Sequence, residues 1–209
     1  MVERLLEKGC NIYLIDNFLV DTGINTADML STRTLRRKIK GIILTHGHYD
    51  HIQSAAILQK KFNCPIFAHE KEIPFILGKE RIQYSGIGKI LSLFDRFFRF
   101  ERPGEVKPVS EIPNFVEEGK NMKIIHTPGH TPGSISILYK NQLVCGDLLR
   151  VKKGISLSPK AFCTDYREYL KSVKKVSSLR FEKIFPGHGE PAERRDFDKL
   201  IERIRNGSD

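Results

Sequence analysis

Three histidines and one aspartate crowd into six residues of this chain, in the stretch His46-Gly47-His48-Tyr49-Asp50-His51. The apolar run 41–44 comes directly before it and is typical of a buried strand. Core packing gains nothing from four polar side chains at one point, so a strand that ends here presents ligands. Neutral imidazole nitrogens and carboxylate oxygens suit Zn²⁺, iron or Mn²⁺ without any thiolate. The stretch therefore predicts a metal site at the end of a buried strand.

The spacing inside this stretch indicates two ions rather than one. His46 and His48 are two residues apart, so on extended chain their side chains point to the same side and can hold one ion. Asp50 and His51 follow where the chain turns, so they can face a second ion close to the first.

Three further candidate ligands, His130, Asp147 and His188, lie far along the chain, each beside an apolar run and next to glycine or proline. Glycine and proline permit the sharp turns and close backbone approach that a site on loops at a sheet edge needs. The predicted ligand sets are His46, His48 and His130 for the first ion and Asp50, His51 and His188 for the second. Asp147 can bridge the two ions because a carboxylate has two oxygen atoms to share.

Five motifs occur in a fixed order along the chain. They are Asp21-Thr22-Gly23, His46-x-His48-x-Asp50-His51, Pro128-Gly129-His130-Thr131-Pro132-Gly133, Gly146-Asp147 and Pro186-Gly187-His188. Together they resemble the motifs of the metallo-β-lactamase-fold hydrolases, and most of all those of the glyoxalase II-like branch. The resemblance implies that Asp21 orients a metal-binding histidine. We expect two divalent metal ions, with zinc favoured over iron or manganese.

Alternating apolar and polar patterns predict a chain that mixes strands and helices. Expected strands lie at residues 11–15, 18–21, 41–45, 65–68, 114–116, 122–126, 135–139, 143–146 and 183–185. Expected helices lie at residues 26–40, 51–61, 166–179 and 196–205. Two β-rich halves with helices outside predict a single α/β domain over residues 1–209. The resemblance implies that this domain is a four-layer αββα sandwich of two mixed sheets with helices on the outer faces.

The segment 78–113 between the two halves is the least determined part. Apolar residues between Ile87 and Phe98 fall on one helical stripe, which is typical of a helix packed on the core. The same stripe fits a lid over the metals or a dimer face, so a homodimer stays open. The stretch 103–113 then connects the halves.

Composition limits the classes of partner. No stretch has the length or apolar character of a membrane span and no N-terminal signal pattern is present, so a soluble cytoplasmic protein is expected. The net charge of +10 attracts anions, but the basic residues are scattered as pairs within helical patterns. Nucleic acid is therefore not the expected partner. The four cysteines form no Cys-x-x-Cys pair and are expected to be reduced and mostly buried.

Three residues close to the motifs have unremarkable interpretations. His69 and His126 each end a predicted strand and are expected to be hydrogen-bonded structural histidines rather than ligands. Cys145 is two residues before Asp147, so on a regular strand the two side chains share a face. We expect Cys145 to be a small buried filler rather than a metal thiolate.

The motifs favour hydrolysis without a protein nucleophile. No serine or cysteine lies in an activating motif such as Gly-x-Ser-x-Gly, so the expected nucleophile is a metal-bound hydroxide. Asp50 is the expected catalytic carboxylate, which orients the hydroxide and carries its proton. The bond is ester-like, and a thioester or lactone fits the resembled branch best. Two alternatives stay open: a mononuclear-iron oxidoreductase similar to the persulfide dioxygenases, and a dinuclear-metal phosphodiesterase or nuclease.

Basic residues after Asp147 suggest a small anionic substrate. Arg150, Lys152 and Lys153 are expected to leave the metal edge on one loop. Arg150 is the candidate substrate contact because its planar guanidinium suits a carboxylate or phosphate group. For Lys152 and Lys153, two roles stay open: they attract the substrate, or they simply reach into water.

Overall fold

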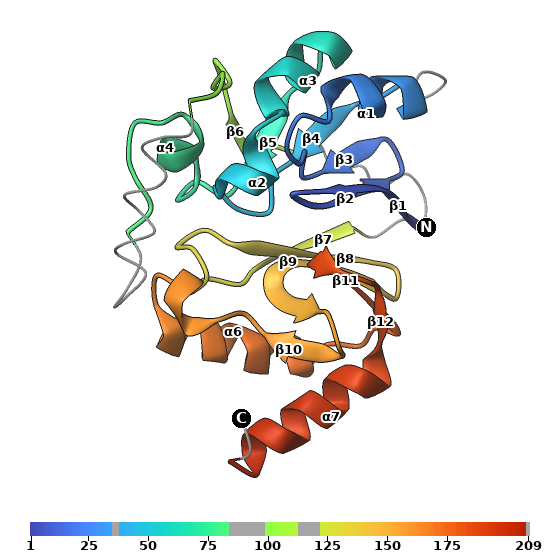
Figure 1. The fold of residues 1–209 in the computed structure, drawn as a ribbon, viewed down its shortest axis with the longest axis vertical. Helices are drawn as coiled ribbons and strands as arrows, with labels where there is room; N and C mark the ends of the chain where they lie inside the picture. The colour runs from blue at the N-terminus through green and yellow to red at the C-terminus, as the bar shows by residue number, and fades with distance from the viewer. Residues whose placement is uncertain (35–37, 84–98, 113–121, 208–209) are drawn as a thin grey trace.

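The computed structural model of this chain describes residues 1–34, 38–83, 99–112 and 122–207. Two mixed β-sheets lie face to face in it, and helices cover the outer side of each (Figure 1). The first sheet has the order β1 (Val2–Lys8), β2 (Cys10–Ile15), β3 (Phe18–Val20), β4 (Gly41–Ile43), β5 (Ile66–Ala68) and β6 (Lys107–Pro108). The second has the order β12 (Ala192–Glu193), β11 (Lys183–Gly189), β9 (Gln142–Val151), β8 (Ile135–Tyr139) and β7 (Met122–His126), and β10 (Ile155–Leu157) pairs with β9.

The helices divide between the two sheets. They are α1 (Ala27–Thr34), α2 (Tyr49–Ile52), α3 (Ala55–Phe62), α4 (Ile73–Ile76), α6 (Tyr166–Ser177) and α7 (Arg194–Arg205), with 3₁₀ turns η1 (Val109–Glu111) and η2 (Lys160–Phe162). Helices α1 and α3 lie over the first sheet, and α6 and α7 lie over the second (Figure 1). Most strand pairs are antiparallel, but β3 to β6 run parallel and β11 pairs in parallel with β9.

The apolar core forms three layers because strand side chains alternate between the two faces of each sheet. On β2, Ile12 and Leu14 pack in the layer under the helices of the first sheet, whereas Tyr13 and Ile15 pack between the sheets. A third layer lies between the second sheet and its helices. This arrangement confirms the predicted four-layer αββα sandwich.

The predicted helix 51–61 is wrong, since the structure has two helices there, α2 and α3. The helix is interrupted at Ser54, because the backbone N–H of Ser54 donates to Gly23 O at 3.3 Å instead of to a helical carbonyl. Its hydroxyl in turn accepts the backbone N–H of Thr26 at 3.1 Å. Contacts with the 23–26 loop therefore replace the helical hydrogen bonds at this point.

The predicted helix 26–40 is too long. Helix α1 ends at Thr34, and residues 38–40 are not helical, because the backbone N–H of Lys40 donates to Asn17 O at 2.8 Å. The predicted strand 114–116 and the helical stripe at 87–98 lie outside the described residues.

Strand β9 is longer than the predicted strand 143–146, so Asp147 and Arg150 lie within a strand and not on a loop. Of the three basic residues, only Lys152 and Lys153 lie in the turn that leads to β10. Gly146 has φ +51°, which interrupts the regular alternation of side chains along β9. Cys145 therefore packs in the outer core layer as a buried filler and does not share a face with Asp147, contrary to the prediction.

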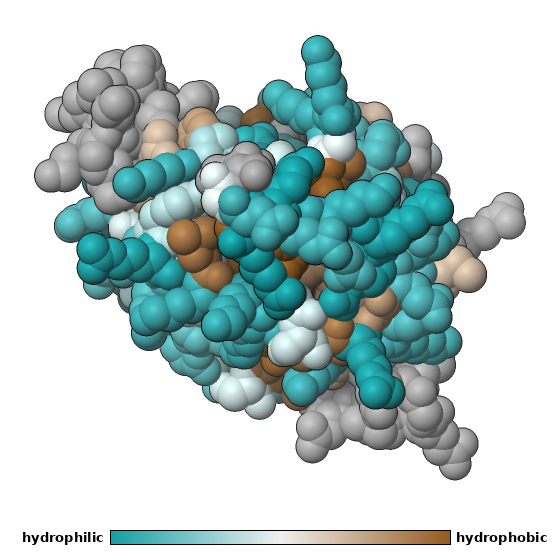
Figure 2. Space-filling model, turned by 90° about the horizontal axis from the view of Figure 1, so that it is seen from below, coloured by the Kyte–Doolittle hydropathy of each residue, from teal (hydrophilic) through white to brown (hydrophobic). Residues whose placement is uncertain are grey.

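The surface around the second half is polar. Figure 2, viewed from the side of α6 and α7, shows mostly hydrophilic residues with only small, separate hydrophobic areas. The polar surface agrees with the interpretation that many of the scattered charged residues lie on solvated helix faces. Among the helices of the described residues, none combines the length and the apolar character needed to cross a lipid bilayer.

Candidate metal centre

All seven predicted ligands gather at one edge of the sandwich, between the two sheets. The first half supplies His46 and His48 from the loop after β4, and Asp50 and His51 from α2. The second half supplies His130 from the turn between β7 and β8, Asp147 from β9 and His188 from β11. Three overlapping groups of these residues have ligand atoms within 4.8 Å of one another and could hold a metal ion.

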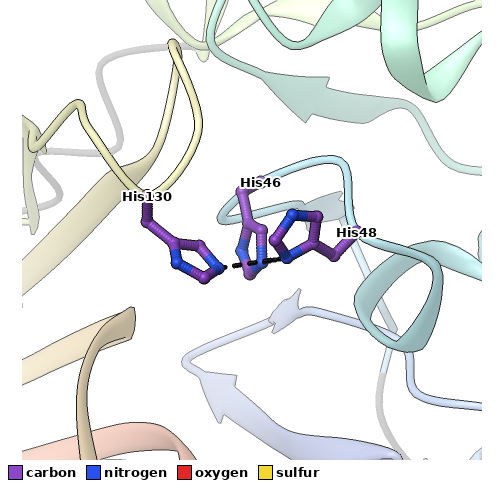
Figure 3. Close-up of side chains that lie close together, drawn as sticks. All are labelled: His46, His48 and His130. Carbon is purple, nitrogen blue, oxygen red and sulfur yellow. Dashed lines mark hydrogen bonds between the residues drawn. The ribbon is translucent and has the colours of Figure 1, made fainter. Parts of the chain in front are cut away.

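The first group consists of three buried histidines whose rings converge (Figure 3). Nδ1 of His48 lies 3.0 Å from Nε2 of His46 and 3.0 Å from Nε2 of His130. Burial lowers the pKa of His48 to about 3 and that of His130 to about 4, and it holds the pKa of His46 well below its usual value. The three rings are therefore neutral at neutral pH, the form in which imidazole binds a metal.

Thr45 fixes the protonation of the first histidine. Its hydroxyl donates to Oδ2 of Asp21 at 2.8 Å, so at 3.0 Å it must accept the Nδ1–H of His46. The lone pair of His46 is then on Nε2, which faces the other two rings.

The second group joins a carboxylate and two histidines. Nε2 of His188 lies 3.3 Å from Oδ2 of Asp50, and both Nε2 of His188 and Nε2 of His51 lie 3.3 Å from Oδ1 of Asp147. The other oxygen of Asp147, Oδ2, lies 3.5 Å from Nε2 of His130 in the first group. Asp147 therefore turns one oxygen toward each group.

The second group is charged, unlike the first. Burial alone lowers the pKa of His188, but Asp147 and Asp50 outweigh it and raise this pKa to about 9. Burial also opposes charge on His51, yet Cys10, Asp21 and Asp50 raise its pKa well above the usual value. Burial opposes ionisation of Asp50 too, but His51 and His188 lower its pKa to about 2. A cation that binds here displaces protons from the two rings.

Asp21 holds His51 in place, at the position that the sequence motif suggested. The backbone of Asp21 has φ +59°, and its Oδ1 accepts the backbone N–H of Thr45 at 2.8 Å. Its Oδ2 accepts the Nδ1–H of His51 at 2.8 Å. Nε2 of His51 therefore faces the second group, and its lone pair becomes available when a bound cation displaces the proton there.

The donor atoms fit a divalent cation. Nε2 of His51 and Oδ1 of Asp147 are buried and make no well-formed hydrogen bond, which is costly for polar atoms unless a ligand satisfies them. Zinc bonds of about 2.0–2.1 Å at tetrahedral angles place neighbouring ligand atoms about 3.3 Å apart. Most of the observed separations are 3.0–3.5 Å and match this requirement, whereas Nε2 of His51 and Oδ2 of Asp50 lie 3.9 Å apart.

Gly187 allows the close approach of β11 to the centre. A Cβ atom at this position would lie 2.3 Å from Oδ1 of Asp147 and 2.9 Å from Cε1 of His51. Only glycine therefore lets the backbone before His188 pass this close to the shared carboxylate.

A cavity of about 320 Å³ adjoins the first group and was not predicted from the sequence. His48 lines it together with the aromatic rings of Tyr49, Phe75 and Phe100. The rings of Tyr49 and Phe100 meet edge to face, with centroids 5.2 Å apart. No sequence periodicity marks these residues, because they come from α2, α4 and the segment before β6, which only the fold brings together.

His69 and His126 lie outside the metal groups. Their rings stack with centroids 4.0 Å apart, and Nε2 of His126 donates to Pro132 O at 3.0 Å. Nδ1 of His69 accepts the backbone N–H of Lys71 at 3.2 Å. These hydrogen bonds fit the predicted structural role.

Comparison with known proteins agrees with this geometry. The family model of the metallo-beta-lactamase superfamily matches residues 6–188. A "probable metallo-hydrolase" of Methanocaldococcus jannaschii is 34% identical over 198 residues, which cover 90% of this chain and 91% of that protein. A hydroxyacylglutathione hydrolase of Haemophilus influenzae is 31% identical over 197 residues, which cover 88% of this chain and 86% of that one.

Solved structures share the fold. A protein crystallised in a di-iron-bound form superposes with a TM-score of 0.71 at 23% identity, over 96% of this chain and 98% of that one. The metallo-beta-lactamase BLEG-1 superposes with a TM-score of 0.66 at 22% identity, over 94% of this chain and 95% of that one. The family model and the Methanocaldococcus jannaschii relative show that the chain belongs to the metallo-β-lactamase superfamily, whose members bind divalent metals.

Proposed function

We propose that this protein is a hydrolase with two metal ions that cleaves an ester-like bond, with thioesters and lactones as the substrate class. One observation carries the proposal: the two oxygens of Asp147 face two different ligand groups. A single ion would need only one of these groups. The relative named hydroxyacylglutathione hydrolase supports an acylated thiol as the type of substrate.

Each residue has a stated part in this proposal. The imidazoles of His46, His48 and His130 hold the first ion, and Asp50, His51 and His188 hold the second. When bound, the two ions lower the pKa of water and polarise the carbonyl oxygen of an ester. Zinc is the favoured metal for histidine and carboxylate ligands, and iron or manganese also suit them.

Asp50 is the proposed catalytic carboxylate because water can reach it. Its side chain is 31% exposed, whereas that of Asp147 is 7% exposed. A pKa of about 2 keeps Asp50 ionised at neutral pH, so it can accept a hydrogen bond from the attacking water and orient it.

The cysteines support a mechanism without a thiol nucleophile. All four are buried, and burial raises the pKa of Cys10 and Cys64 to about 11 and that of Cys163 to about 12. Burial also raises the pKa of Cys145. Thiolates, which are the reactive form, are therefore disfavoured at every cysteine.

Metal analysis tests the proposal directly. Wild-type protein purified without added metal should hold two ions per chain, and His188→Ala should lower this toward one, because the second group loses a ligand. Elemental analysis measures the content. The control is His126→Ala, which removes a histidine outside the groups and should keep both ions. Chelators should abolish thioester or lactone cleavage, whereas alkylation of cysteines should leave it largely intact.

Three results would contradict the proposal. One iron per chain, unchanged in His188→Ala, would favour the mononuclear oxidoreductase. A cleavage activity that resists chelators but is lost on alkylation would point to a thiol enzyme. Cleavage of a phosphodiester in preference to any ester would favour the nuclease class.

Arg150 is the proposed contact for an anionic group of the substrate. It is the register partner of His188 on the neighbouring parallel strand, so it lies beside the second group. Its Nε is buried and makes no hydrogen bond, although a guanidinium nitrogen is a strong donor. The cavity beside His48 offers aromatic walls for the apolar part of the same substrate.

Substitution of Arg150 should weaken binding of anionic substrates only. Arg150→Ala should raise KM for a carboxylated thioester about tenfold, roughly 1.4 kcal/mol, with little change in kcat. A neutral thioester of similar size should be nearly unaffected. Lys153→Ala is the matched control, since it removes the same charge from the exposed turn after β9. An equal rise in KM in Arg150→Ala and Lys153→Ala would show that the overall positive charge attracts the substrate and that Arg150 does not contact it.

A further inference from the structure

The ligands of each metal group come from both halves of the sandwich, so their geometry depends on how the halves meet. The layer between the two sheets is apolar, formed by residues such as Tyr139 and Phe185. Apolar packing is not directional, whereas a metal site requires ligand positions within about 0.5 Å. Directional contacts between the halves must therefore fix the ligand loops relative to each other.

Glu72 makes such a contact at the first group. It is fully buried, just before α4. Its Oε2 accepts the backbone N–H of Gly47, between His46 and His48, at 2.7 Å. Its Oε1 accepts the backbone N–H of Gly133, on the His130 turn, at 2.6 Å. One carboxylate therefore joins the two loops that carry the first group.

Space around Glu72 is closed on both sides. A Cβ atom at Gly133 would lie 2.8 Å from Cγ of Glu72, and one at Gly47 would lie 3.0 Å from its Oε2. Burial raises the pKa of Glu72, while hydrogen bonds from Thr131, Gly133 and Gly47 oppose this rise. Burying a carboxylate costs free energy unless hydrogen bonds compensate for the lost water. The three hydrogen-bond donors therefore allow Glu72 to be buried at this position.

Two residues of β2 make the corresponding contact at the second group. Nδ2 of Asn11 donates to Pro186 O at 2.9 Å and to Gly189 O at 2.6 Å, and the hydroxyl of Tyr13 donates to Pro186 O at 2.6 Å. Both side chains are buried and belong to the first sheet. They hold the backbone of β11 on either side of His188.

We propose that Glu72 positions the first metal group and that Asn11 with Tyr13 positions the second, each independently of the other. The inference rests on the proposed two-metal centre. Outer contacts of this kind typically change metal affinity by about 10- to 100-fold. Sequence patterns gave no sign of Glu72, because the segment His69-Glu70-Lys71-Glu72 has the composition of a solvated charge run.

Co²⁺ binding to metal-free protein tests the two contacts separately. His188→Ala reports the first group alone, and His48→Ala reports the second group alone, each through its own Co²⁺ absorption bands. Glu72→Gln sets an amide N–H₂ against a backbone N–H donor, so it should weaken Co²⁺ at the first group about tenfold or more. It should change the second group by less than about twofold. Tyr13→Phe, alone and with Asn11→Ala, should show the reverse pattern.

The controls separate positioning from charge and from stability. Glu70→Gln removes the same charge from an exposed side chain two residues away and should leave both affinities unchanged. If Glu72→Gln does not fold, Glu72→Asp keeps the charge but is too short to reach both loops. If the double variant of Tyr13 and Asn11 does not fold, Tyr13→Phe alone tests the contact at the second group. Thermal unfolding without metal shows which variants fold.

The outcomes are distinct. Equal weakening of both groups by Glu72→Gln, or by Tyr13→Phe, would overturn the inference and leave only a general structural role. No change in either affinity would overturn it as well. Wild-type protein that binds no Co²⁺ would overturn the proposed function itself, and the inference with it.

Discussion

Asp147→Ala is expected to lower the occupancy of both metal sites and to reduce hydrolysis by about three orders of magnitude or more, roughly 4 kcal/mol of lost transition-state stabilisation. The reason is that its two oxygens face the two groups, at 3.3 Å from His188 and 3.5 Å from His130. Elemental analysis and steady-state kinetics on a thioester measure both effects.

The control for this variant is another aspartate with a defined structural task. Asp165 caps helix α6, where its Oδ1 accepts the backbone N–H groups of Arg167 and Glu168. Asp165→Ala should cost about 1 kcal/mol of stability but keep both ions. Asp147→Ala protein that retained two ions and full activity would remove the basis for a shared ligand.

Gly187→Ala is expected to disrupt the centre although it removes no ligand. Its Cβ would lie 2.3 Å from Oδ1 of Asp147 and 3.1 Å from the backbone carbon of Gly146, so the shared carboxylate or strand β11 must move. Metal content should fall to one ion or fewer, and activity should fall by about 100-fold or more, because a displacement of about 1 Å is enough for such a loss.

A glycine in open space gives the matched control. A Cβ at Gly104 meets nothing within 4 Å, so Gly104→Ala should leave metal content and activity unchanged. Normal activity in Gly187→Ala would mean that β11 shifts to accommodate the extra methyl group. The close approach of β11 to Asp147 would then not be needed for activity.

The candidate site was more predictable than the fold around it. Metal ligands are chemically distinctive and stand beside glycine or proline, so His46, His130 and His188 could be selected from the sequence without knowing any contact. Asp21 was found only through its motif, since nothing local to it points toward His51.

What the sequence could not reveal depends on contacts between distant segments. The break at Ser54 arises from hydrogen bonds with the 23–26 loop, which helical periodicity does not report. Strand β1 was missed, because its burial alternates only in part along Val2–Lys8. Glu72 gave no signal because burial, and not composition, distinguishes it from its charged neighbours.

Parallel pairing of β9 with β11 has a consequence for assembly during synthesis. Parallel strands need a crossover connection, and here the connection from β9 to β11 contains β10, η2 and α6, which are synthesised before β11. In the proposed centre, the three histidines of the first group are all present once His130 is made, whereas the shared Asp147 and then His188 come later in the chain. The proposed first site therefore has its three histidine ligands before the proposed second site is complete, so we expect the order of ligands along the chain to favour filling of the first site before the second.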